Sequence, residues 1–277
     1  KVLEQLDGLA NGKTHVLMGQ SSSPSRARLI AGLKAKGVNF YEYEPVDFSV
    51  HEEAARIAFG QAVKPYYKFN EAKAILSLDC DFLGTEESAY QHIRDFADGR
   101  RVKDDHTENP AETMNRLYSV EGLLTLTGTN ADHRLRIPTG SIIRVAALAL
   151  AELLGHPDIN VNVDVSKWSN FAADLNKDFP KSHATEDQDE VNAVKWVREC
   201  VADLVRLAKE DKRTLVVAGY RQPKEVHLVA MAMNALLDNV GSTITLLQSE
   251  PTGNGSITDL ATNFNKGDNL VVLGSDP

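Results

Sequence analysis

The sequence predicts an α/β fold in which parallel sheets are covered by helices. Short β-rich runs alternate with helical stretches along most of the 277 residues. Ser23 and Pro24 form a helix start, and Gly37 follows as a helix stop. One apolar helix, at residues 140–154, is expected inside the core. Repeated strand–helix alternation indicates parallel pairing, because a helical crossover returns the chain to the same edge of the sheet.

The first expected elements show the alternation clearly. Residues 15–19 are a short apolar run that ends at glycine, which is typical of a buried strand. The capped helix spans residues 26–36, and residues 38–44 alternate and are rich in aromatic side chains, which favours a strand. Further helices are expected at residues 50–59, 86–99, 191–208 and 223–237, and further strands at residues 74–79, 117–121, 214–219, 243–247 and 270–274.

The helix at residues 140–154 carries the strongest packing prediction. It is apolar on most of its faces and ends at Gly155, so it has too little polar surface for a solvent-exposed helix. The side chains that we expect to be buried are Ile142, Val145, Ala146, Leu150 and Leu153.

Composition excludes several classes of protein. The chain is 42% apolar and 25% charged, as in globular proteins, and its net charge of −9 argues against nucleic-acid binding. No run approaches the roughly 18–20 consecutive apolar residues that a membrane-spanning helix needs. The two cysteines, Cys80 and Cys200, are too few for a cysteine-ligated iron–sulfur cluster or a disulfide scaffold.

Two local segments partly resemble known binding motifs but do not match their patterns. Residues 19–24 follow a strand but match neither a phosphate loop nor a nucleophile elbow, so helix capping is the expected role of these serines. An anion held at this helix start near Arg26 or Arg28 is the alternative. Residues 158–164 lack the glycine and glutamate of a calcium loop and are expected to be an edge strand or extended segment.

Charged clusters also have ordinary explanations. The basic run that includes Arg100 is balanced by neighbouring aspartates, which predicts a solvated face. The densest polar cluster is at residues 130–136, where His133 lies between Asp132 and Arg134. None of the eight histidines has the spacing of a metal site. The residues alone therefore indicate an α/β protein without an evident catalytic site.

Several segments together resemble the molybdopterin oxidoreductase superfamily. Residues 130–141 with the apolar helix after them resemble one segment of that family, and residues 218–241 resemble another. Residues 274–277 resemble its strand-end GxNP turn, with Asp in place of Asn. Residues 76–84, 114–121 and 127–134 are similar to the large iron–sulfur subunit of alternative complex III, a bacterial quinol oxidoreductase.

The resemblance implies a two-lobe organisation. It implies two interleaved Rossmann-like lobes, the first made of residues 1–70 and 240–277 and the second, inserted lobe of residues 71–239. The last expected strand has no covering element after it, so we also expect the chain to be a segment of a longer protein.

Departures from the family pattern bear on the cofactor. Asp79 and Asp81 add bulk and negative charge where the family's glycine-rich strand end holds a pyrophosphate. Residues 138–141 also lack the aspartate that reads a guanine in cofactor-binding members. The resemblance thus implies no pterin or metal in this segment, with iron–sulfur clusters elsewhere in the full-length subunit.

The resemblance also implies a vestigial cofactor cleft. Its candidate residues are Asp79, Asp81, Asp132, His133, Arg134 and Arg136. Residues 130–136 follow a strand, so we expect them to form a loop that reaches the crevice at the strand carboxyl ends. There the two arginines would pair with the three aspartates, and the histidine would hydrogen-bond to backbone. A wholly solvent-exposed loop is the alternative.

Three functions are compatible with these observations. The first is a cofactor-free scaffold on the periplasmic side of the bacterial inner membrane. Its partners would be the ferredoxin-like iron–sulfur domain of the same subunit, haem c subunits and quinol-binding integral membrane subunits. The second is a fragment of a catalytic molybdopterin-dinucleotide oxidoreductase. The third is a stand-alone protein that binds an anionic ligand at Ser21–Ser23.

Overall fold

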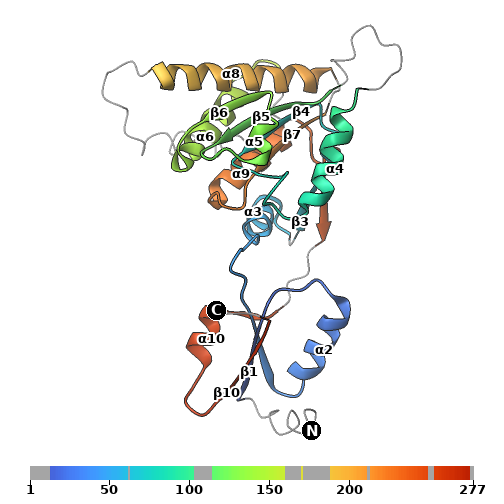
Figure 1. The fold of residues 1–277 in the computed structure, drawn as a ribbon, viewed down its shortest axis with the longest axis vertical. Helices are drawn as coiled ribbons and strands as arrows, with labels where there is room; N and C mark the ends of the chain where they lie inside the picture. Colours follow the sequence, from blue (N-terminus) through green and yellow to red (C-terminus); the bar gives the residue numbers. More distant parts are fainter. Residues whose placement is uncertain are drawn as a thin grey trace. The chain divides into compact units, whose positions relative to one another are not determined.

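The computed structural model describes residues 13–61, 63–102, 114–159, 170, 188–210, 213–248 and 253–274. The chain divides into two compact units. Unit 1 contains Lys1–Asp47 and Glu250–Pro277, and unit 2 contains Phe48–Ser249. Each unit is built on a parallel sheet with helices beside it (Figure 1).

Unit 1 combines the two ends of the chain in one sheet of order β10-β1-β2-β9, in which all neighbours are parallel. Val16 on one face packs with Ile30 of the first helix, and Leu17 on the other face packs with Leu260 of the last helix. The two helices therefore cover opposite faces of this sheet. The elements are β1 (Thr14–Met18), α2 (Pro24–Lys34), β2 (Val38–Glu42), β9 (Gly255–Ser256), α10 (Ile257–Asn263) and β10 (Asn269–Leu273).

Unit 2 contains a second parallel sheet, of order β6-β5-β4-β7. Its strands are β4 (Ala74–Leu78), β5 (Arg116–Glu121), β6 (His133–Arg136) and β7 (Thr214–Ala218). The chain builds outward from β4 through β5 to β6, and then returns to place β7 on the other side of β4. The carboxyl ends of β4 and β7 thus meet at a topological switch point, where open α/β sheets usually bind their ligands.

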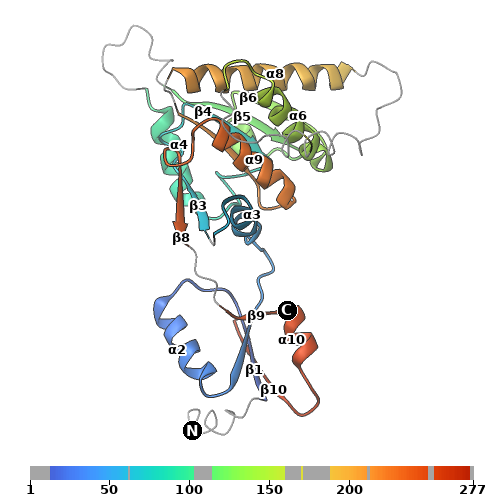
Figure 2. The ribbon, with the colours of Figure 1, turned by 180° about the vertical axis from the view of Figure 1, so that it is seen from behind.

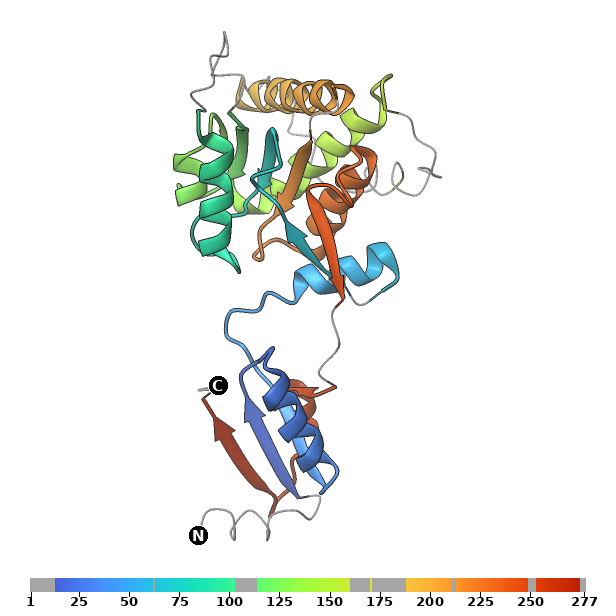
Figure 3. The same cartoon turned by 90° about the vertical axis from the view of Figure 1, so that its right-hand side faces the viewer.

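Helices cover both faces of the unit 2 sheet. One face packs against α6 (Ile142–Leu154), α8 (Gln188–Lys209) and α9 (Lys224–Leu236). Figure 2 shows α6 and α9 side by side. The opposite face packs against α4 (Ala89–Arg100), which lies across the sheet from α9 (Figure 3). The short α5 (Leu126–Thr129) connects β5 to β6.

A two-stranded antiparallel ribbon completes unit 2. It pairs β3 (Val63–Tyr67) with β8 (Ile244–Gln248) beside α3 (Val50–Phe59). The alternation of strands and helices in the sequence predicts parallel pairing throughout, and no strand was predicted at β3. Tyr66 and Tyr67 give β3 its strand character, but Pro65 occupies its centre and obscures the pattern.

The predicted fold class is confirmed, as is the burial of the apolar helix. All five side chains predicted to be buried on α6 are at most 8% exposed. The calcium-like segment and the turn at residues 274–277 lie largely outside the described residues, as does most of residues 155–189, which the sequence predicts to be a polar, irregular insertion or surface excursion. Among the described residues, no helix has the length and apolar content needed to cross a membrane.

The boundaries between the two observed units differ from the boundaries between the two lobes that the resemblance implies. Residues 48–70 and 240–249 were assigned to the first lobe, whereas the structure places them in unit 2. The reason is packing. Ala54 of α3 and Val63 of β3 share a buried cluster with Met231 of α9, and β3 pairs with β8 along its whole length.

Candidate functional site

The carboxyl ends of β4 and β7 approach each other closely. Asp79 follows β4 with a positive φ of 53°, a conformation that aspartate tolerates better than most residues. A Cβ atom at Gly219 would lie 2.0 Å from the Asp79 carbonyl oxygen, so this position needs glycine. The Gly219 N–H donates to the Leu78 carbonyl at 3.0 Å. Backbone from the two loops therefore fills the switch point.

The Asp79 carboxylate has a partner within this site. Gln222 Nε2 donates to Asp79 Oδ2 at 2.8 Å. Burial raises the pKa of Asp79 above its usual value, although the Gln222 hydrogen bond opposes this shift. A half-buried carboxylate of this kind disfavours a second anion beside it.

Asp81 ties the loop after β4 to α5. Its side chain is buried and accepts hydrogen bonds from two backbone N–H groups. Thr127 N–H donates to Oδ1 at 3.0 Å, and Thr85 N–H donates to Oδ2 at 3.2 Å. A carboxylate with two amide donors satisfies most of its hydrogen-bonding capacity inside the protein.

Two further carboxylates at this end of the sheet were not predicted. Glu86 is buried and accepts the Tyr220 N–H at 3.1 Å. Glu121 is buried and accepts from Thr125 Oγ1 and from Arg134 Nε, both at 2.6 Å. Both glutamates lie in or beside loops that follow strands, where acidic residues are common, so no sequence signal marked them.

These contacts bear on whether a pterin dinucleotide fits. Phosphates bind where backbone N–H groups at strand and helix ends are free to donate to them. Here the N–H groups of Thr85, Thr127 and Tyr220 already donate to carboxylates of the chain. A pyrophosphate would have to displace buried carboxylates and then lie beside them. The residues at the carboxyl ends of the unit 2 sheet therefore do not fit the pyrophosphate of such a cofactor.

The structure corrects the prediction that residues 130–136 form a crevice loop. Residues 133–136 are strand β6, which pairs with β5 from Tyr118↔His133 to Glu121↔Arg136. Because α5 crosses back to start this strand, Asp132 and His133 lie at its amino end, away from the crevice. Only Arg136 ends the strand on the crevice side, and it is exposed.

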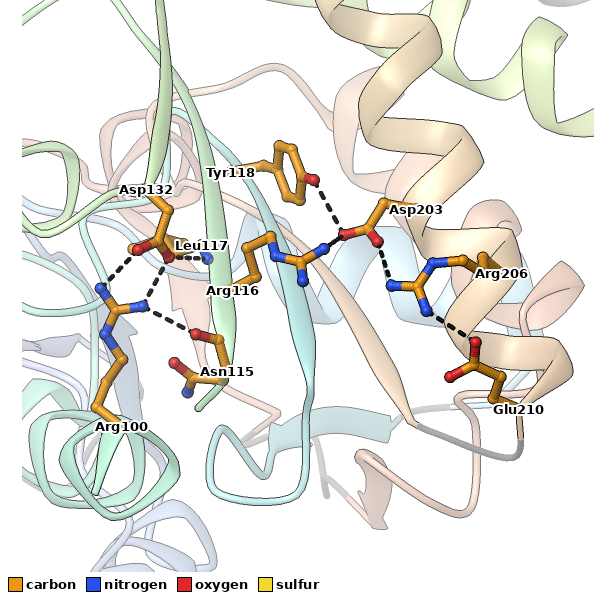
Figure 4. A network of polar contacts seen from close by, with 9 residues as sticks. All are labelled: Arg100, Asn115, Arg116, Leu117, Tyr118, Asp132, Asp203, Arg206 and Glu210. Atoms are coloured by element: carbon orange, nitrogen blue, oxygen red, sulfur yellow. Dashed lines mark hydrogen bonds and ion pairs between the residues drawn. The ribbon is translucent and has the colours of Figure 1, made fainter. Parts of the chain in front are cut away.

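The predicted partner of Arg134 is also wrong. Arg134 pairs with Glu121, because both side chains lie on the same face of neighbouring strands. Asp132 instead forms a bidentate pair with Arg100 at the end of α4, with N–O distances of 2.6 and 2.9 Å (Figure 4). Arg100 is thus a structural partner and not part of a simple solvated face.

The pKa of Asp132 reflects this environment. Burial raises it, but donors outweigh burial and hold the pKa below its usual value. These donors are Arg100 and the Leu117 N–H, which lies 2.8 Å from Asp132 Oδ2. The group therefore anchors the start of β6 to β5 and α4.

A second network joins α8 to β5 (Figure 4). Asp203 accepts from Arg116, from the Tyr118 hydroxyl at 2.9 Å and from Arg206 at 2.7 Å. Burial raises the pKa of Asp203, yet these three donors hold it below its usual value. The network anchors α8 on the sheet, as ion-pair networks in folded proteins often do.

His133 has a different role from the one predicted. It is exposed, makes no hydrogen bond with a described residue, and stacks on Tyr118 with ring centroids 4.8 Å apart. Tyr118 in turn donates its hydroxyl to Asp203. His133 thus extends the α8 network outward.

The described residues contain no group of three or more His, Cys, Asp or Glu side chains that could hold a metal ion. Both cysteines are buried, and burial raises the pKa of each thiol. Thiols in such surroundings are poor nucleophiles at neutral pH.

Comparison with known proteins bears on the fold. No protein-family model matches the chain, and no curated protein matches it. Among solved structures, acetylene hydratase from Pelobacter acetylenicus, a molybdopterin and tungsten enzyme, is similar with a TM-score of 0.55 and 12% identity. The similarity covers 88% of this chain and 33% of that one, so the chain spans about a third of the enzyme's length. The chain thus has a mixed α/β fold with parallel sheets flanked by helices, and this fold is similar to that of part of acetylene hydratase.

Proposed function

We propose that the chain is a cofactor-free scaffold built on a molybdopterin-oxidoreductase-like fold. One observation carries this proposal. The backbone N–H groups of Thr85, Thr127 and Tyr220, at the carboxyl ends of the unit 2 sheet, donate to carboxylates of the chain itself. Asp81 and Glu86 accept these N–H groups, which are therefore not free to donate to an anionic cofactor.

In this proposal the polar residues hold loops and helices in place. Asp81 fixes the turn after β4 against α5, Glu121 with Arg134 fixes β6 against β5, and Asp203 fixes α8. We assign no proton-transfer step to these three carboxylates, because each already accepts hydrogen bonds from the protein.

We further propose that the scaffold belongs to a bacterial membrane-bound quinol oxidoreductase of the alternative complex III type. Support comes from the similarity of residues 76–84, 114–121 and 127–134 to its large iron–sulfur subunit. These segments form β4 with its following turn, β5, and α5 with the start of β6. The partners would be the ferredoxin-like iron–sulfur domain of the same subunit, haem c subunits and quinol-binding membrane subunits, on the periplasmic side.

Purification from native membranes tests both the scaffold proposal and the proposal that the scaffold belongs to a quinol oxidoreductase. The full-length protein, tagged in its own organism, is analysed for molybdenum, tungsten, guanine nucleotide, haem c and quinol oxidation. The scaffold proposal expects no molybdenum, tungsten or nucleotide, whereas stoichiometric amounts would favour a catalytic molybdopterin enzyme. Co-purifying haem c subunits with quinol oxidation support the finer proposal, and their absence from the intact membrane complex contradicts it.

Variants separate a structural from a catalytic role. We expect Arg134→Ala to lower the yield of assembled complex while the assembled fraction keeps its turnover, because Arg134 supports Glu121. The exposed His133 provides a matched control, since His133→Ala should alter neither quantity. Loss of turnover in a fully assembled complex would contradict the scaffold proposal.

A further inference from the structure

The helix α4 carries an exposed apolar stripe in addition to its buried face. Phe96, on the buried face, packs into the core of unit 2. On another face Tyr90, Ile93 and Ala97 are exposed, and the exposed fractions of Tyr90 and Ile93 are 90% and 42%. Residues spaced at i, i+3 and i+7 lie on one side of a helix, and two packed helices meet with this spacing. The stripe therefore has the form of a helix-packing surface.

A groove of about 610 Å³ lies beside the stripe, between α4 and α5. Its apolar lining includes Ile93 and Ala97 of the stripe, Leu126 of α5, and Leu83 from the turn after β4. Leu126 is 60% exposed, so the apolar surface continues from α4 to the other wall of the groove. A hollowed apolar surface accommodates the side chains of a second helix better than it accommodates a flat lipid surface.

Charged side chains border the stripe on the side away from the groove. Arg94 and Asp98 lie one turn apart there, and Arg94 forms no ion pair with a described residue. The ion pair between Asp98 and Arg101 is 4.0 Å long, and these two side chains are 64% and 75% exposed. Both signs of charge are thus accessible to a second molecule along one short helix.

A second copy of α4 in the antiparallel direction complements the apolar stripe. In a two-fold symmetric pair of helices, residues before the centre of the contact face residues after it in the other copy. With the centre at residue 95, Ile93 faces Ala97 of the second copy, so a large side chain meets a small one. In nearly the same register Tyr90 faces Arg101, and an arginine over a tyrosine ring is a favourable contact.

The same register also complements the charges. The two-fold axis is perpendicular to both helices, so each flank of the stripe faces the same flank of the second copy. Arg94 then faces Asp98 of the second copy, and symmetry creates this pair of opposite charges twice. Because α4 itself supplies both members of every pair, its pattern identifies the second molecule as another copy of this chain.

We propose that the chain forms a symmetric dimer in which two copies of α4 pack antiparallel, with the groove between α4 and α5 receiving the apolar side chains of the partner helix. A contact built on one exposed helix face is at the small end of specific interfaces, so the dimer dissociates readily. The proposal does not depend on the scaffold function, because the contact uses elements of unit 2 alone.

Sedimentation equilibrium of the whole chain over a wide range of concentrations tests this proposal. We expect a reversible equilibrium between monomer and dimer. Tyr90→Ala should raise the dissociation constant roughly three- to tenfold, because aromatic side chains contribute strongly to interfaces. Tyr90 is 90% exposed, so this change should leave the fold of the monomer intact. Leu29→Ala is the matched control, since Leu29 is 69% exposed on α2 and should not affect the dimer.

A charge exchange tests the antiparallel register. Arg94→Glu and Asp98→Arg each place like charges opposite each other, so each should raise the dissociation constant roughly three- to tenfold. The double variant Arg94→Glu/Asp98→Arg restores opposite charges and should recover the affinity of the unaltered chain. Circular dichroism checks that all variants are folded.

The proposal is overturned by any of three results. The first is a chain that stays monomeric at every concentration, including one that binds lipid vesicles through Tyr90 instead. The second is a dimer whose dissociation constant changes neither with Tyr90→Ala nor with the single charge changes, which would place the contact on another surface. The third is a double variant that associates no more tightly than the single charge variants.

Discussion

The two units have the same strand–helix architecture, but the side chains of their strands and helices are buried to different extents. In unit 2, β4 and β7 are buried along their whole length, because helices or the antiparallel ribbon cover both faces. In unit 1, β10 lies at the edge of the sheet, and its Leu270 and Leu273 are 47% and 54% exposed. Parallel strands are normally buried on both faces, so unit 2 follows the rule more closely than unit 1.

The helices differ in the same way. On α6 of unit 2, seven residues are buried, whereas α2 of unit 1 has no fully buried residue. The largest buried cluster of unit 2 unites three helices with three strands, while the two clusters of unit 1 contain four and three buried residues. Because apolar burial is the main source of folding free energy, we infer that unit 2 dominates the stability of the described chain.

The largest expected effect is at the centre of unit 2. Leu150 is 0% exposed on α6, so Leu150→Asp would bury an unpaired carboxylate and should lower the unfolding free energy by about 5 kcal/mol. Leu29→Asp on α2 is the matched control, because Leu29 is 69% exposed and should tolerate the change. Urea unfolding monitored by circular dichroism measures both. Equal effects would contradict the difference between the units.

A pH change should weaken unit 2 next most strongly. Burial lowers the pKa of His92 to about 4 and of His227 to about 3, from an ordinary value of 6.5. The folded state therefore binds fewer protons than the unfolded state, and stability is lost as the pH falls below about 6.5. At pH 5 each histidine should cost about 2 kcal/mol relative to pH 7.

Hydrogen exchange can localise this acid effect. After correction for intrinsic rates, protection of the β4 and β7 amides should fall between pH 7 and pH 5. His227→Gln should remove part of the dependence, whereas His133→Gln, at an exposed site, should not. Unchanged unfolding free energy between these pH values would mean that the two histidines do not titrate as their burial implies.

The contrast between units also explains what the sequence could reveal. The apolar residues of 140–154 identified α6, because the buried positions of a helix recur at a regular spacing within one short segment of sequence. The Ser23–Pro24 start of α2 was equally local, and the structure confirms the Ser23 cap. Features defined by neighbouring residues were therefore predictable in both units.

Features defined by distant residues were not predictable in this way. Arg100 and Asp132 are 32 residues apart, and only the return of β6 beside β5 brings them together. No strand was predicted at residues 133–136, because β6 has only four residues and three of them have polar or charged side chains.

The Arg134–Glu121 pair should have an intermediate effect. Glu121 is 2% exposed and Arg134 Nε lies 2.6 Å from it, so Arg134→Met leaves a buried carboxylate that keeps only its Thr125 donors. We expect a loss of about 2–3 kcal/mol, below that for a wholly buried pair because Arg134 is partly exposed. Arg136→Met, at the exposed end of β6, is the control. Urea unfolding of both variants measures the difference, and equal stability would show that Thr125 alone satisfies Glu121.

The smallest expected effect lies in unit 1, at the start of α2. Ser23 Oγ accepts the Arg26 N–H at 3.4 Å, and Pro24 occupies the first turn. Replacing an N-cap serine with alanine costs about 0.5–2 kcal/mol, and this long, exposed hydrogen bond favours a value of about 1 kcal/mol, in the lower half of that range. Ser22→Ala is the matched control, because Ser22 is exposed and lies outside the cap.

Site-resolved hydrogen exchange makes this small effect informative. If unit 1 opens without unit 2, Ser23→Ala should speed exchange of the β1 and β2 amides about fivefold, which corresponds to about 1 kcal/mol, and leave β4 unchanged. If the units open together, β4 amides should exchange faster by the same factor. The second outcome would contradict the inference that the weakly buried unit 1 is a separate, less stable unit. Faster exchange in β1 and β2 alone would show that the two units also differ in cooperativity. The loss of one helix cap would then change the exchange rates only within unit 1.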